Sequence, residues 1–167
     1  MIQHILVPLD GSQLAELALP YAVKLAYPTG HITLVSVIDI PEVHAYSLYE
    51  VPFTMQTDDY NAFVANAERS ARDYLQRLVE QVSGNSALKV DSEYFVGEPA
   101  SVILDRARKL NIDAIVMSTH GRSGFSRWLF GSITQKVLSE MPCPVFVVPG
   151  GKKDKTATQE RVKVTAS

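Results

Sequence analysis

Short apolar runs rich in β-branched residues alternate with amphipathic helical stretches along most of the sequence. Each run is far shorter than a membrane span and is bounded by turn residues, as is typical of buried strands. Strands that alternate with helices run parallel, because each helix carries the chain back to the same edge of the sheet. The pattern predicts an α/β fold: a single-domain, Rossmann-like parallel five-stranded sheet, in the order 3-2-1-4-5, with helices on both faces.

Residue patterns place the individual elements. Strands are expected at 2–8, 32–38, 89–96, 113–117 and 144–148, and the alternation of polar and apolar residues in the third is typical of an edge strand. Helices are expected at 12–25, at 58–82, after Pro99 and at 132–141, with Pro28-Thr29-Gly30 ending the first. The helix after Pro99 carries a polar face that we expect to be solvated, formed by Asp105, Arg106, Arg108 and Lys109.

Composition narrows the class of protein. The chain has 167 residues and a net charge of −2, which favours one soluble domain without a strong attraction to nucleic acid or membrane surfaces. The first residues enter a strand directly and lack a basic leader, so the cytoplasm is the expected location. Residues 41–58 are irregular and aromatic and are interpreted as a loop, and 150–167 as a flexible polar tail.

Two loops carry the candidate binding residues, because ligands of such sheets lie beyond the carboxyl ends of the strands. If strands one and four are neighbours, both loops face one crevice. Glycines allow backbone N–H groups to approach an anion, and a helix start adds further N–H groups. The loops are interpreted as a phosphate cradle, with an ordinary tight turn as the alternative. They contain Pro8, Leu9 and Asp10 in the first, and Ser118, His120, Gly121, Arg122, Gly124, Gly131 and Ser132 in the second.

These residues resemble the motif of the universal stress protein family. The matching residues are Asp10 after the first strand, Gly121, nine further residues, and then Gly131-Ser132. ATP-binding members of that family carry Gly, two residues, Gly, nine residues, Gly, and then Ser or Thr. The resemblance extends from about Ile2 to Pro149. It departs at Ser118, where the family motif has its first glycine, and the added Cβ narrows the approach to the ribose or phosphates.

The resemblance implies a nucleotide-binding domain over 1–149, with ATP, or ADP or AMP, as the ligand, with or without Mg²⁺. It places Asp10 and the backbone around Val37 at the adenosine end. Apart from the resemblance, the Asp10 carboxylate is the candidate contact for nucleotide-bound Mg²⁺, which prefers oxygen ligands. Met117 and Ser118 would line the nucleoside. The backbone N–H groups expected at the phosphates are those of Gly121, Gly131, Ser132 and Ile133. The resemblance also implies a homodimer paired through the last strand, Val145 to Val148.

The leading hypothesis is a regulatory, stress-response module that binds an adenine nucleotide. We identify no catalytic residue, because the loop lacks a lysine, a pair of carboxylates and a Ser-His-Asp arrangement. Two alternatives stay open. One is a slow ATPase or related nucleotide hydrolase with His120 or Asp10 as base. The other is a nucleotide-free dimeric scaffold in which Ser118 blocks the site.

Overall fold

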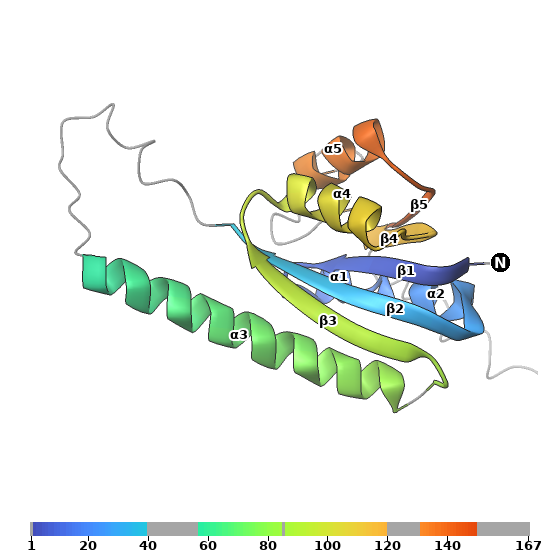
Figure 1. The fold of residues 1–167 in the computed structure, drawn as a ribbon, viewed down its shortest axis with the longest axis horizontal. Coiled ribbons are helices and arrows are strands. Elements are labelled where there is room, and N and C mark those ends of the chain that lie inside the picture. The colour runs from blue at the N-terminus through green and yellow to red at the C-terminus, as the bar shows by residue number, and fades with distance from the viewer. Residues whose placement is uncertain (1, 40–56, 85, 120–130, 150–167) are drawn as a thin grey trace, which may run out of the picture.

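The structure, a computed structural model, describes residues 2–39, 57–84, 86–119 and 131–149 (Figure 1). The predicted tail and nearly all of the predicted aromatic loop lie outside these ranges. The elements are β1 Ile2–Leu9, α1 Gln13–Glu16, α2 Leu19–Leu25, β2 Ala26–Ile38, α3 Thr57–Ser83, β3 Lys89–Val96, α4 Pro99–Lys109, β4 Ala114–Ser118, α5 Ser132–Glu140 and β5 Val145–Val148.

The strands form one parallel sheet in the order β3-β2-β1-β4-β5, which confirms the predicted topology. In the central strand β1, Ile5 pairs with Ile32 on one side and with Ala114 on the other. Strand β3 forms one edge of the sheet, as its alternating pattern predicted. Because all strands run the same way, their carboxyl ends open at a single edge, which positions the site described below.

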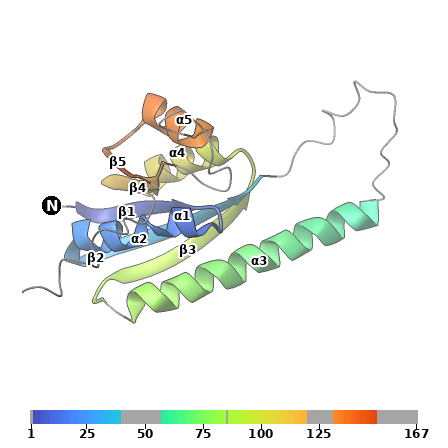
Figure 2. The ribbon, with the colours of Figure 1, turned by 180° about the vertical axis from the view of Figure 1, so that it is seen from behind.

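Helices cover both faces of the sheet (Figures 1 and 2). The helices α1, α2 and α3 enclose one core with Ile5 and Val7 of β1, whereas α4 and α5 enclose a second core with Leu6. This division follows from the alternation of side chains along a strand. Each fully buried Leu or Ile side chain contributes about 1.5–3 kcal/mol by leaving water, so these two cores hold the sheet between its helices.

The first predicted helix is in fact two short helices, α1 and α2, separated at Leu17 and Ala18. The single-helix prediction was wrong because Pro20 has no N–H to donate to the carbonyl of Glu16. Pro20 instead occupies the first turn of α2, where no intrahelical donor is needed. Helix α1 is capped by Ser12, whose hydroxyl accepts the N–H of Ala15 at 3.1 Å.

Strand β2 begins at Ala26, ahead of the predicted start at Ile32. Pro28 and Gly30, expected to end the preceding helix, instead lie within this strand. The pairing of β1 with β2 shifts here, since Ile2 is opposite Ala26 but His4 is opposite His31. A proline is tolerated in such an irregularity because the ladder requires no hydrogen bond from it.

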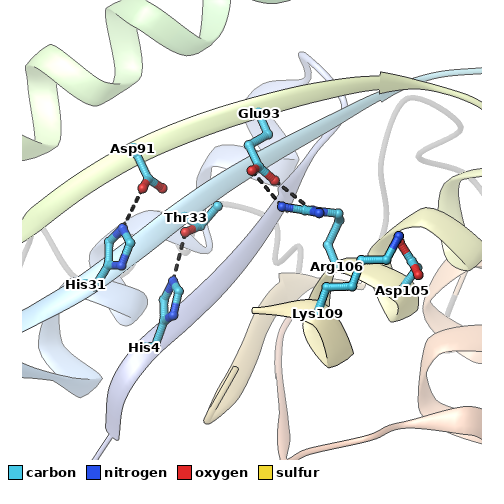
Figure 3. Close-up of polar contacts among 8 residues, drawn as sticks. All are labelled: His4, His31, Thr33, Asp91, Glu93, Asp105, Arg106 and Lys109. Carbon is cyan, nitrogen blue, oxygen red and sulfur yellow. Dashed lines mark hydrogen bonds and ion pairs between the residues drawn. The ribbon is translucent and has the colours of Figure 1, made fainter. Parts of the chain in front are cut away.

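The predicted solvated face of α4 requires one correction, at Arg106. Its guanidinium makes two hydrogen bonds to the Glu93 carboxylate, of 2.7 and 2.8 Å (Figure 3). It also lies over the ring of Phe95. The Arg106 side chain is only 17% exposed. Lys109 and Asp105 form an exposed pair of 2.9 Å, as that prediction requires. Because the Glu93 carboxylate on β3 accepts two hydrogen bonds from its guanidinium, the Arg106 side chain lies against the sheet instead of extending into solvent.

No helix in the described part of the chain is long and apolar enough to span a membrane.

Candidate nucleotide-binding cleft

A cleft opens at the carboxyl ends of β1, β2 and β4 and has two adjacent compartments. The first, which we call the apolar pocket, has a volume of about 100 Å³ and lies between the sheet and α4. The second, the outer chamber, has a volume of about 590 Å³ and reaches to α3. The compartments lie next to each other and share five lining residues: Asp10, Val37, Pro99, Ile133 and Thr134.

The apolar pocket contains much of the predicted nucleoside end. Pro8, Leu9 and Met117 line it, together with Ser118 at the end of β4. The Ser118 side chain is buried, so the residue that replaces the motif glycine is part of the pocket wall. Side chains that sequence reasoning did not select complete the wall, namely Ala15, Val35 and Ile103. Their apolar surfaces suit a flat, weakly polar ring system.

Asp10 lies at the end of β1 and borders both compartments. One of its carboxylate oxygens accepts the backbone N–H of Ser12 at 3.0 Å. Gly11 between them has a φ of 83°, in the left-handed region that glycine adopts without strain. The tight turn points Asp10 into the cleft and at the same time starts α1, so the local structural role and the predicted ligand role are compatible.

The N-terminus of α5 forms the far side of the outer chamber. Gly131 is its N-cap residue, and no side chain of the described residues caps this helix end. The Gly131 N–H donates to the Thr119 carbonyl at 2.9 Å, and the Thr134 hydroxyl donates to the Ser118 carbonyl at 3.3 Å. Strand β4 thus fixes the helix start. The first N–H groups of a helix have no acceptor within the helix and carry its positive dipole end.

One ion pair joins the two helices that border the cleft. The Glu98 carboxylate caps α4 by accepting the N–H groups of Ala100 and Ser101, and Lys136 of α5 donates to it at 2.9 Å. Hydrogen bonds from Ser101 and Lys136 lower the pKa of Glu98 to about 2. Neither Glu98 nor Lys136 stood out in the sequence, because their partnership depends on α4 and α5 lying side by side.

The charged side chains in the described lining are Asp10 and Asp39, and both are acidic. No three His, Cys, Asp or Glu side chains converge as metal ligands within the described ranges. Of the predicted residues, the structure brings together Pro8, Leu9, Asp10, Val37, Met117, Ser118, Gly131, Ser132 and Ile133. The predictions for His120, Gly121, Arg122 and Gly124 concern residues outside the described ones.

Comparison with known proteins identifies the family. The model of the universal stress protein family matches residues 1–149. The chain belongs to this family. A protein of Staphylococcus aureus (strain USA300) assigned to the universal stress proteins is 30% identical over 149 residues, which cover 87% of this chain and 83% of that protein.

Solved structures of the family share the fold. Universal stress protein UspA from Lactobacillus plantarum is 28% identical and has a TM-score of 0.70, covering 88% of this chain and 97% of its own. Two more distant structures also have the fold, each with a TM-score of 0.62. One is a universal stress protein in complex with cAMP, 18% identical over 90% of this chain and 98% of its own. The other is an Arabidopsis thaliana family protein with AMP bound, 15% identical over 94% of this chain and 97% of its own.

Proposed function

We propose that the cleft binds an adenine nucleotide, with ATP as the principal ligand, and that the chain is a cytoplasmic, nucleotide-responsive stress-response module. The observation that carries this proposal is that an apolar pocket lies directly beside a chamber at a helix N-terminus. The base occupies the pocket against Val35 and Met117. The phosphates occupy the chamber at the N–H groups of Gly131, Ser132 and Ile133. The cAMP and AMP bound by the two distant family structures support this choice of ligand class.

The charge of the lining supports binding of the nucleotide with a divalent cation. Asp10 and Asp39 are both acidic, so a polyphosphate next to them is repelled unless a cation lies between. Carboxylate and phosphate oxygens are the ligands that Mg²⁺ prefers. Asp10 would hold the ion, which would neutralise phosphate charge.

The proposal is tested by titration calorimetry of the purified chain with ATP. Saturable binding that weakens by at least about tenfold when EDTA replaces Mg²⁺ is expected, since one lost charge-assisted contact corresponds to about 1.4 kcal/mol or more. GTP serves as the control for the base. Absence of ATP binding by folded protein from which bound nucleotide has been removed would contradict the proposal. Phosphate release from the same samples, lost in Asp10→Ala, would instead favour the slow hydrolase.

Strand β5 is the proposed site of homodimer formation. It is a short sheet edge, and Phe146 on it and Met141 before it are 38% and 54% exposed. Pairing of the β5 edges of two copies gives hydrogen-bond partners to the open N–H and C=O groups of each edge and covers these apolar side chains. We expect the wild type to sediment as a dimer and Phe146→Asp as a monomer. Val96→Asp, on the opposite edge of the sheet, is the matched control and should remain dimeric; a monomeric wild type refutes the pairing.

A further inference from the structure

A group of polar side chains crosses the sheet on the side covered by α4 (Figure 3). It lies near the amino end of β1, whereas the cleft lies at the carboxyl ends of the strands. His4, His31 and Asp91 contribute to it from β1, β2 and β3, together with Thr33 from β2. The two histidines are far apart in the sequence and are brought together by the strand register, in which His4 is the partner of His31. We call these four residues the histidine cluster. It belongs neither to the cleft nor to the β5 edge.

The geometry distinguishes the two imidazole rings. They are stacked, with centroids 4.1 Å apart and planes 12° from parallel. His31 Nε2 lies 2.7 Å from Asp91 Oδ2, which is the distance of an ion pair. His4 Nε2 lies 2.9 Å from the hydroxyl of Thr33, which is buried. When Nε2 of a neutral His4 carries no proton, it accepts the hydroxyl proton of Thr33; when Nε2 is protonated, it donates and the hydroxyl oxygen accepts.

Charged groups surround the cluster from each neighbouring element. Asp113, before β4, accepts the backbone N–H groups of Gln3 and His4. On β3, Lys89 is the exposed register partner of His31. On α4, Arg106 is paired with Glu93 and Lys109 with Asp105, so their charges are largely compensated. Asp91 is therefore the anion in contact with an imidazole, and it contacts His31 rather than His4.

We propose that the histidine cluster is a proton-sensitive latch: it joins β1, β2 and β3 while His4 is neutral, and it weakens when His4 takes up a proton. The Asp91 carboxylate lies 2.7 Å from His31, and the charge of His31 opposes the uptake of a proton by His4. A second proton on His4 puts two like charges face to face at stacking distance, where they repel each other. The second carboxylate oxygen of Asp91, Oδ1, is buried and has no hydrogen-bond partner in the described part of the chain.

The direction of the pH effect follows from linkage. Burial, followed by the charge of His31, lowers the pKa of His4 from 6.5, and Asp91, Asp113 and the Leu110 carbonyl oppose this shift. Above the ordinary pKa, both folded and unfolded chains leave this histidine neutral. Below it, the unfolded chain binds the proton more readily, so the stability of the fold decreases until folded His4 is also protonated. Each unit by which the pKa of His4 is lower in the folded than in the unfolded chain increases the unfolding equilibrium constant at low pH by up to about tenfold.

Urea denaturation of the full chain at about pH 7.5 and about pH 5, the range in which histidine titrates, measures this effect. The wild type should lose stability on acidification, and His4→Gln should lose less. For each unit by which the pKa of His4 differs between folded and unfolded chains, the increase in the unfolding constant should be smaller in His4→Gln by up to about tenfold. Equal losses in the two proteins would overturn the proposal. His31→Gln is the matched variant, because it removes the facing charge and leaves His4 in place.

Nuclear magnetic resonance titration of the imidazole protons adds a test whose wild-type result does not depend on whether the variants fold. In the wild type, the His4 resonance should titrate below pH 6.5. In His31→Gln, which removes the facing imidazole, the midpoint for His4 should move upward. A His4 midpoint at or above 6.5 in the wild type, or one that stays in place in His31→Gln, rejects the latch.

Discussion

Gly131→Val is expected to reduce the affinity for Mg²⁺-ATP by at least about 100-fold, or about 2.7 kcal/mol, while the chain remains folded. The backbone of Gly131 has φ −68° and ψ 161°, a conformation open to any residue. A Cβ there would lie 3.4 Å from the Thr119 carbonyl oxygen, an ordinary contact. The two methyl groups beyond it would occupy the space in which a phosphate meets the N-terminus of α5. Titration calorimetry measures the loss.

Two controls distinguish steric exclusion of the phosphates from destabilisation of α5. Ser139→Val places the same side chain on the exposed end of α5 and should bind as the wild type does. Gly131→Ala adds only the Cβ and should give an intermediate affinity. The proposed position of the phosphates is wrong if Gly131→Val retains wild-type affinity. A wild type that does not bind ATP contradicts the proposed function itself, so the two failures are distinguishable.

Leu34→Ala is expected to destabilise the fold by about 3–5 kcal/mol, the largest effect on folding that we predict. Leu34 is fully buried in the core between β2 and α3, and its neighbours cannot collapse completely onto the space that its side chain leaves. The loss combines the transfer of its methyl groups with the cost of the cavity. Urea denaturation gives the difference in unfolding free energy.

Leu17→Ala is the matched control for that measurement, because Leu17 is 38% exposed. Its loss should be close to the scatter of surface substitutions, about 0.5 kcal/mol. Equal losses at the two positions would mean that the core between β2 and α3 does not dominate the stability of the domain.

The arrangement of the strands could be predicted from the sequence because two independent patterns agree. Continuous apolar runs such as Ile115 to Met117 mark strands covered on both faces, whereas the alternation at Lys89–Val96 marks an edge. The separation between α1 and α2 was missed although Pro20 was visible. Apolar residues continue at helical spacing through that point, and the missing hydrogen bond leaves no trace in hydrophobic periodicity.

The candidate cleft could be predicted only in part. Asp10, Ser118 and Gly131 have polar or conformational signatures at the ends of elements, so the loops were recognisable. The apolar wall was not, because a valine such as Val35 in a strand looks the same whether it faces a helix or a ligand. The contacts of Arg106 and the stacking of His4 on His31 depend on register and on packing between elements, which a linear pattern does not encode.

The central position of β1 has a consequence for how the chain folds. This strand is made first, yet one of its two neighbours, β4, begins only at Ala114. On a ribosome, β1 can pair with β2 early, and its other edge stays open until most of the domain has emerged. Contacts between such distant parts of a chain slow folding. A nascent chain of this protein therefore exposes an apolar strand edge for much of its synthesis, and this is the stage at which a chaperone would be most useful.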